Sequence, residues 1–142
     1  REIIQARHID FSTENLDFMV FSDAKWLEFI LGQILTNSIK YGSNRIVVAA
    51  AQNQDGDIEL EISDNGIGIA EKDLSRIFEK TFTGANGRQA DSSRSTGMGL
   101  YIVNTLCRKL GHQVSAESII GQGTTIKIVF KNHDYYHVTN SQ

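Results

Sequence analysis

The chain has 142 residues, enough for one domain with one sizeable core but not for two. It is 40% hydrophobic and 22% charged, as globular domains are, and its net charge of -3 argues against duplex nucleic acid as a partner. It begins at Arg1 and has no run near the ~20 apolar residues that span a bilayer, so we expect a soluble fragment of a longer protein. The single Cys107 cannot form an internal disulfide and fits a reducing compartment.

The first predicted elements are two short strands, at His8–Phe11 and Asp17–Phe21, separated by a polar turn. Ser22-Asp23 has the composition of a helix N-cap. The following residues predict a long helix over Ala24–Tyr41, which Gly42 ends.

Two further strands, at Arg45–Ala51 and Asp57–Ser63, flank the hairpin signal Asn53-Gln54-Asp55-Gly56. A short helix is expected over Glu71–Phe78. The segment Thr81–Thr96 is rich in Gly, Ser, Asn and Arg, so we expect a mobile surface loop there.

The last predicted helix covers Gly99–Leu110 and has its apolar residues along one face. Strands follow at His112–Glu117 and Gly123–Phe130, and the tail Lys131–Gln142 has no clear period. This order predicts a two-layer α/β sandwich, with a mixed sheet of about five strands and three helices on one face.

The long helix carries polar residues where its buried face should continue. The face changes from apolar to polar along Trp26, Ile30, Gln33, Asn37, Lys40 and Tyr41. A buried Asn37 amide needs partners, because leaving it unpaired costs ~1–3 kcal/mol. An oxygen-rich ligand or a metal would supply them, and so would a neighbouring loop.

A carboxylate lies at the end of the second hairpin strand. Alternation places Asp64 on the core-facing side together with Ile58, Leu60 and Ile62, where it is costly unless it accepts hydrogen bonds. The glycines of the following turn, Asn65-Gly66-Ile67-Gly68, allow a ligand to approach the backbone closely. A ligand site is the favoured interpretation, and an Asp that caps its own turn is the alternative.

Two other segments complete this pattern. Ser95–Leu100 joins the expected loop to a helix start, where bare amides among glycines suit an anionic phosphate, although such glycines are also common without a ligand. Thr124 shares parity with the apolar residues of the last strand, so it can point inward beside Asp64.

Together these segments resemble the GHKL, or Bergerat-fold, ATP-binding domain, and within it the sensor histidine kinases. The resemblance covers about Asp10 to Phe130, with five motifs in the family's order. They are an asparagine box at Gln33–Tyr41, glycine boxes at Asp64–Ile69, Gly97–Leu100 and Gly121–Thr124, and a phenylalanine box at Arg76–Lys80. The local sequences of three segments further resemble the intramembrane-sensing kinases that respond to bacitracin and other cell-envelope peptides. These segments are Lys25–Leu27, Phe82–Arg88 and Ser95–Tyr101.

The resemblance implies ATP and Mg²⁺ as cofactors. Asp64 would accept the adenine amino group with support from Thr124, Asn37 would ligate Mg²⁺, and Lys40 would pair with phosphate. Asn37 and Lys40 would be the catalytic residues, Tyr41 would lie against the adenine or ribose, and Thr81–Thr96 would be the ATP lid. The implied nucleotide-binding set is Asn37, Lys40, Tyr41, Asp64, Gly66, Gly68, Ile69, Phe78, Thr96, Gly97, Met98, Gly99, Leu100 and Thr124.

The chain departs from the family pattern at two places. Gln33 stands where the related ATPases carry a Glu that acts as general base for water, and Gln cannot take a proton, so phosphotransfer is favoured over hydrolysis. The arginine often found after the phenylalanine box is replaced by Thr81-Phe82-Thr83. Either Arg88 or Arg94 takes its place, or both are plain surface residues.

The phosphate-accepting histidine is expected outside this chain. The usual acceptor motif ends in proline, and the chain has none, so His8, His112, His133 and His137 are expected to be structural or solvent histidines. We divide the chain into a remnant of an upstream dimerisation helix or linker (1–6), the catalytic domain (7–131) and a tail (132–142).

The implied partners are a dimerisation and histidine-phosphotransfer domain of the same protein and a response regulator. The parent would be a membrane-bound homodimer, with this domain on the cytoplasmic face. Two alternatives remain. One is a GHKL protein serine kinase or anti-sigma factor, and the other is a nucleotide-binding module without catalysis, against which Asn37 and Lys40 argue.

Overall fold

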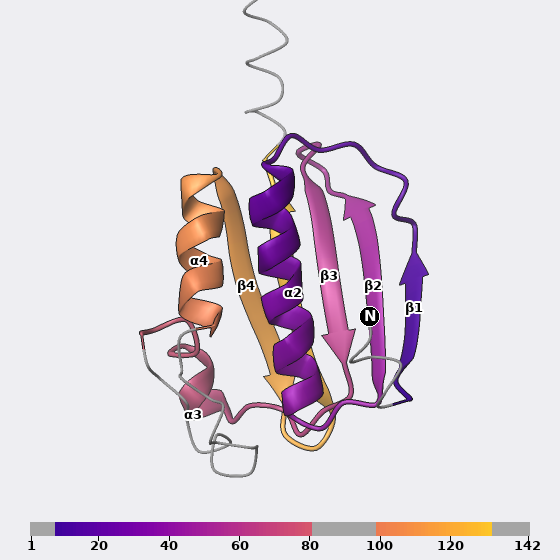
Figure 1. The fold of residues 1–142 in the computed structure, drawn as a ribbon, viewed down its shortest axis with the longest axis vertical. Coiled ribbons are helices and arrows are strands. Elements are labelled where there is room, and N and C mark those ends of the chain that lie inside the picture. The colour runs from indigo at the N-terminus through magenta and orange to yellow at the C-terminus, as the bar shows by residue number, and fades with distance from the viewer. Residues whose placement is uncertain (1–7, 81–98, 132–142) are drawn as a thin grey trace, which may run out of the picture.

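The computed structural model describes residues 8–80 and 99–131, which form one five-stranded sheet with helices packed on it (Figure 1). The strands lie in the order β1-β2-β3-β5-β4. The β1–β2 pair is parallel and the other pairs are antiparallel. Their bounds are β1 Asp10–Glu14, β2 Arg45–Gln52, β3 Ile58–Asp64, β4 His112–Ile119 and β5 Gly123–Phe130.

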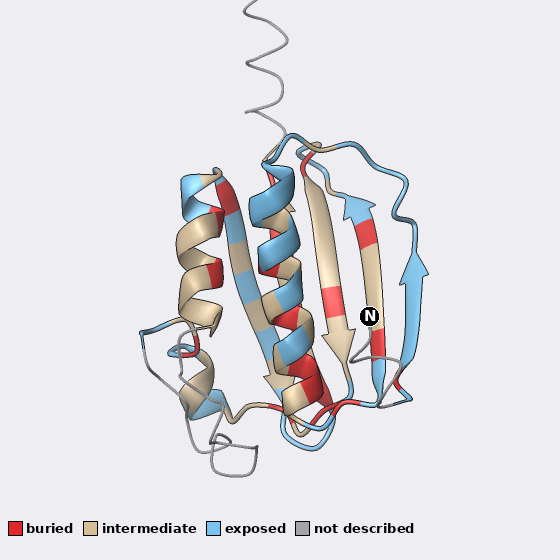
Figure 2. Ribbon diagram, viewed as in Figure 1, coloured by how far each residue is buried: buried red, intermediate tan, exposed pale blue. Residues whose placement is uncertain are grey.

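The helices α2 (Ala24–Lys40), α3 (Glu71–Leu74) and α4 (Gly99–Lys109) all lie on one side of the sheet (Figure 1). The predicted two-layer α/β sandwich with a mixed sheet is therefore confirmed. Figure 2 shows the buried residues on the sides of α2 and α4 that face the sheet, so the core lies between the two layers. The buried apolar cluster contains Ile9, Ile30, Ile34, Ile39, Ile46, Ile62, Val103, Cys107, Ile126, Ile128 and Phe130.

Local signals in the sequence define both ends of α2. The Asp23 carboxylate accepts a hydrogen bond of 2.9 Å from the Trp26 amide, which satisfies a free donor of the first turn. Gly42, with a φ of 88°, ends the helix, and its amide donates to the Ile39 carbonyl at 3.1 Å. This geometry confirms the predicted cap and stop.

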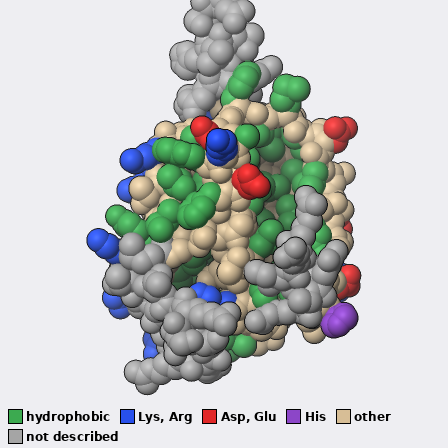
Figure 3. All heavy atoms as spheres, viewed as in Figure 1, with side chains coloured by type: hydrophobic (Ala, Val, Ile, Leu, Met, Phe, Trp, Pro, Cys, Tyr) green, Lys and Arg blue, Asp and Glu red, His purple; other side chains and the backbone are tan. Residues whose placement is uncertain are grey.

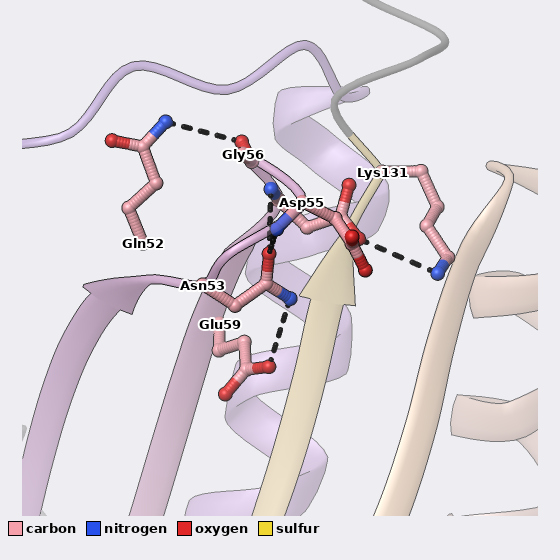
Figure 4. Close-up of polar contacts among 7 residues, drawn as sticks. Gln52, Asn53, Asp55, Gly56, Glu59 and Lys131 are labelled. Carbon is pink, nitrogen blue, oxygen red and sulfur yellow. Dashed lines mark hydrogen bonds and ion pairs between the residues drawn. The ribbon is translucent and has the colours of Figure 1, made fainter.

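The β2–β3 hairpin is closed by the Asn53 side chain (Figure 4). Asn53 Oδ1 accepts the amides of Asp55 and Asp57 at 2.9 and 3.0 Å, and its Nδ2 donates to Glu59 Oε2 at 3.0 Å. Lys131 Nζ lies 3.4 Å from the buried Asp57 carboxylate. The turn and the end of β5 are thus held together at this end of the sheet.

The prediction of two short strands before α2 was wrong. A single strand, Asp10–Glu14, runs through the residues expected to turn, and Asp17–Phe21 is not a strand. Each residue of β1 is paired in parallel with β2, from Asp10 with Arg45 to Glu14 with Ala49. The strand ends at Glu14, and the next residue, Asn15, has a φ of 53°, which is outside the extended region.

The short helix predicted over Glu71–Phe78 is only one turn long in the structure. After Leu74, the amides of Arg76 and Glu79 bond the carbonyls of Asp73 and Arg76 at 2.9 and 3.0 Å. These contacts span three residues and form tight turns rather than an α-helix. The expected loop Thr81–Thr96 and the predicted segments 1–6 and 132–142 lie outside the described residues.

Candidate functional site

Asp64 ends β3 at the same end of the sheet where β5 begins. It lies opposite the fully buried Ile46 on β2 and opposite Thr124 on β5. Residues that face each other on neighbouring strands share a face, so the Asp64 carboxylate is on the core-facing side, as predicted. Its Oδ1 accepts hydrogen bonds from the amides of Gly66 at 2.9 Å and Thr124 at 3.2 Å. Within the described part of the chain Oδ2 takes no hydrogen bond, so the carboxylate retains a free acceptor.

A hydroxyl network lies beside Asp64. Ser118 Oγ accepts the Ile69 amide at 2.7 Å, donates to the Gly123 carbonyl at 2.8 Å and lies 2.7 Å from Thr124 Oγ1. Because Ser118 has one hydroxyl proton and gives it to Gly123, the Thr124 hydroxyl is the donor to Ser118. We did not predict Ser118, although it has the inward parity of Val114 and Ala116 on the same strand.

The glycine turns after β3 and before β5 pack backbone against backbone. Gly68 has a φ of 80°, and a Cβ on it would overlap the Ile119 carbonyl. Gly123 has a φ of 134°, and a Cβ on it would overlap the Asp64 carbonyl. Only glycine tolerates both constraints. These two glycines therefore allow the two turns to pack directly against each other beside Asp64.

The end of α2 joins the same cluster. The Ile67 amide donates to the Tyr41 carbonyl at 3.1 Å, which ties the turn after β3 to the helix end. Asn37, Lys40 and Tyr41 are half-buried. The side chains of Asn37 and Lys40 have no hydrogen bond or ion pair to any residue in 8–80 or 99–131. The alternative that Asn37 bonds a neighbouring loop therefore has no support among these residues.

The start of α4 lies next to α2. A Cβ on Gly99 would lie 3.0 Å from Gln33 Oε1, so the Gln33 amide borders the first residue of α4. In Figure 1 the end of β3, the end of α2 and the start of α4 all lie toward the lower end of the molecule. The predicted acid and the glycine-led helix start are thus at one end, with the polar face of α2 near both.

The remaining predicted positions are only partly described. Leu100, Ile69 and Phe78 are half-buried, and Phe78 follows the buried Ile77. Thr96, Gly97 and Met98 lie outside the described residues, as do Arg88 and Arg94.

The described histidines have different surroundings. His8 is exposed, whereas His112 is buried, stacks on Phe130 with ring centroids 4.6 Å apart and has Nε2 2.9 Å from Ser22 Oγ. A buried, hydrogen-bonded His112 is structural, as expected. Among the described residues no three His, Cys, Asp or Glu side chains form a group that could hold a metal ion.

One group of exposed apolar side chains lies away from Asp64, in the segment before α2. Figure 3 shows that apolar side chains gather on the face that carries the helices. Met19 and Phe21, in the segment before α2, are 83% and 55% exposed. A hollow of about 240 Å³ lies beside them, lined also by Gly56, Leu110 and Lys131. These residues belong to the hairpin end of the sheet, so this hollow is separate from the Asp64 cluster.

The fold and this cluster define an ATP-binding domain. The family model described as histidine kinase-, DNA gyrase B-, and HSP90-like ATPase matches residues 22–134, and the chain belongs to this family. The chain is similar to the sensor histidine kinase GraS of Staphylococcus haemolyticus, with 42% identity over 133 residues, and to the sensor protein kinase GraS of Staphylococcus aureus (strain MRSA252), with 40% over 131 residues. Each match covers 92% of this chain but only 38% and 37% of the relative.

Solved structures agree with this assignment. The mycobacterial sensor histidine kinase MprB matches with a TM-score of 0.78 and 28% identity over 91% of this chain and 88% of that one. Full-length ShkA in complex with AMPPNP matches with a TM-score of 0.73 and 22% identity over 92% of this chain and 28% of that one, which shows the shared fold. The predicted resemblance to sensor histidine kinases is confirmed.

Proposed function

We propose that this domain binds Mg-ATP and transfers the γ-phosphoryl group to a histidine outside the chain, as the catalytic domain of a two-component sensor kinase. The observation that carries the proposal is the Asp64 carboxylate. Its Oδ1 is held by two backbone amides, and its Oδ2 takes no hydrogen bond from the described residues. Such a group can accept a hydrogen bond from a ligand without rearrangement.

The chemistry of Asp64 favours adenine. Its acceptor oxygen would receive the amino group of adenine, whereas guanine presents a carbonyl oxygen at the same position and would be repelled. The Thr124 hydroxyl lies beside Asp64 and would support this contact through a water. Tyr41 and the half-buried Ile69 and Phe78 would flank the base or ribose.

The polar end of α2 fits the phosphates and their metal ion. The half-buried Asn37 offers an amide oxygen without a partner in the described chain, and Mg²⁺ prefers such oxygen ligands together with phosphate oxygens. When bound, the ion would neutralise charge on the β- and γ-phosphates. Lys40 would pair with a phosphate, and the amides at the start of α4, around Gly97, Met98 and Gly99, would hold the others.

Transfer rather than hydrolysis is supported by Gln33. Its amide oxygen borders the start of α4, where the phosphates would be bound, and an amide does not accept a proton from water. The buried His112 has no exposed position from which to attack a phosphate. The chain contains no proline, so none of its histidines lies in the usual acceptor motif. The accepting imidazole would therefore come from a dimerisation and histidine-phosphotransfer domain of the same protein, and the phosphoryl would pass to a response regulator.

The whole protein would be a membrane-bound homodimer with residues 7–131 as its catalytic domain on the cytoplasmic face. Supporting this, the chain spans 38% of the length of a relative named as a sensor histidine kinase, which leaves room for other domains. The likeness to GraS also supports the predicted subgroup that responds to cell-envelope peptides. None of the helices within residues 8–80 and 99–131 has the length and apolar character of a membrane span. The alternative of a serine kinase or anti-sigma factor is not favoured by these relatives.

Two measurements test the proposal. Calorimetric titration of the chain with ATP and Mg²⁺ should give a micromolar dissociation constant, about -8 kcal/mol at 1 μM. With labelled ATP, the chain should then transfer label to a separately supplied dimerisation domain. The chain incubated alone with labelled ATP should not become labelled. Equally tight GTP binding would count against adenine recognition by Asp64. Tight ATP binding without transfer would leave the alternative of a binding module without catalysis.

A further inference from the structure

Ser43 is a buried residue for which the proposed function provides no role. It is 7% exposed, and its Oγ has no hydrogen-bond partner among the residues that the structure describes. Its amide is satisfied, because it donates to the Ser38 carbonyl at 3.2 Å. An unpaired buried hydroxyl is destabilising, and native proteins keep few of them without a reason.

The surroundings of Gly66 show what Ser43 faces. A Cβ on Gly66 would lie 2.8 Å from the Tyr41 carbonyl oxygen, 3.0 Å from Ser43 Oγ and 3.2 Å from Asp64 Oδ1. Three oxygens thus lie around the position that a side chain on Gly66 would occupy. A carbonyl and a carboxylate can only accept hydrogen bonds, so the Ser43 hydroxyl is the only one of the three that can donate.

The two acceptors differ in how much they gain from a further donor. The Tyr41 carbonyl already accepts the Ile67 amide. Asp64 Oδ1 already accepts two amides, but it belongs to a group that carries a negative charge, and hydrogen bonds to charged groups are the stronger ones. Rotation of the Ser43 side chain toward Asp64 would satisfy the hydroxyl and add a third hydrogen bond to the carboxylate oxygen that the two amides hold.

We propose that Ser43 is a positioning residue of the base pocket, which donates a hydrogen bond to Asp64 Oδ1 and so holds Oδ2 toward the adenine amino group. This inference rests on the proposed function. Ser43 does not touch the nucleotide, because its Oγ is enclosed beside Gly66. Its effect on binding therefore passes through Asp64 and depends on a ligand that has an amino group for Asp64 to accept.

The test compares two ligands on two variants of this chain. One ligand is ATP, and the other is purine riboside triphosphate, which has hydrogen in place of the amino group. The variants are Ser43→Ala and, as a matched control, Ser63→Ala. Ser63 is a half-buried serine of β3 whose hydroxyl is already paired with Thr125 Oγ1 at 2.9 Å.

We expect Ser43→Ala to weaken ATP binding by about 3- to 10-fold, as the loss of one hydrogen bond does, and to change binding of purine riboside triphosphate by less than about twofold. Ser63→Ala should leave both affinities unchanged. Because Ser43→Ala loses one hydrogen bond at most, its melting temperature without nucleotide should fall by only about 2–8 °C, so the variant stays folded in the titrations.

An unchanged ATP affinity in Ser43→Ala, or an equal loss for both ligands, would overturn the inference while leaving the proposed function intact. A wild-type chain that does not bind ATP, or that binds both ligands equally, would instead overturn adenine recognition by Asp64 and this inference with it. The two failures are therefore distinguishable in one set of titrations.

Discussion

Thr124 and Asp64 lie directly opposite each other on β5 and β3, and the Thr124 amide donates a hydrogen bond of 3.2 Å to Asp64 Oδ1. The Gly66 amide holds the same oxygen from the other side of the turn, at 2.9 Å. The carboxylate is therefore fixed by backbone groups of two different elements. Rotating it would break both contacts, so its orientation is set before a ligand arrives.

Replacing Asp64 with Asn should weaken ATP binding by about 10- to 100-fold, because a hydrogen bond to a charged acceptor contributes about 1.5–3 kcal/mol. Calorimetric titration with Mg-ATP measures the loss. Glu61→Gln is the matched control, since Glu61 lies on the same strand but points to the other face, where it pairs with Lys127 at 3.7 Å. A similar loss in both variants would show that the effect is not specific to Asp64.

Replacing Asn37 with Ala should abolish the contribution of Mg²⁺ to ATP binding. If the Asn37 amide oxygen is a metal ligand, the ratio of dissociation constants without and with Mg²⁺ should approach one in the variant, while affinity in the presence of a chelator stays the same. Thr36→Ala changes the neighbouring exposed residue of α2 and should keep the wild-type ratio. If Asn37→Ala keeps the wild-type ratio of dissociation constants, Asn37 is not a ligand of the metal ion.

Replacing Gly123 with Ala should lower the free energy of unfolding by more than about 2 kcal/mol, because the new Cβ would overlap the Asp64 carbonyl at a φ that alanine disfavours. Urea denaturation followed by circular dichroism gives the value. Gly32→Ala should have the opposite sign, with a gain of about 0.5–1 kcal/mol, because Gly32 is inside α2 and nothing lies within 4 Å of its Cβ position. Equal effects would contradict the close packing described for Gly123.

Stability should fall at alkaline pH because of Cys107. Burial raises the pKa of its thiol from 9.0 to about 11. In the unfolded chain the thiol ionises first, so the contribution of the neutral buried thiol is complete below about pH 9 and is lost as the pH rises to about 11. The loss is about 3 kcal/mol at most. The difference in unfolding free energy between wild type and Cys107→Ala should shrink over this window. A constant difference would show that the alkaline loss of stability does not come from the Cys107 thiol.

Features that depend on neighbouring residues were predictable from the sequence. The cap at Asp23, the stop at Gly42 and the turn around Asn53 each rest on hydrogen bonds within a few residues, and all three are present. The inward direction of Asp64 follows from the alternation of β3, which the register with Ile46 confirms.

Features that depend on distant residues were not. Ser12, Thr13 and Glu14 have the composition of a turn, but pairing with β2, more than 30 residues later, makes them a strand. The length of the helix after Glu71 was overestimated because its apolar spacing does not show where tight turns replace helical bonds. Nothing in the sequence around Ser43 indicates that its hydroxyl faces Gly66, because only tertiary packing brings these loops together.

The buried thiol at Cys107 has a practical consequence for spectroscopy. It is the one cysteine in the chain, and it is fully enclosed and largely protonated at neutral pH, so maleimide reagents should leave it untouched in the native protein. A cysteine introduced at the exposed Gln54 would then be the only thiol that reacts with maleimide. Gln54 lies on the β2–β3 turn, at the other end of β3 from Asp64. A dye attached there could report on nucleotide-dependent changes without first removing the native residue.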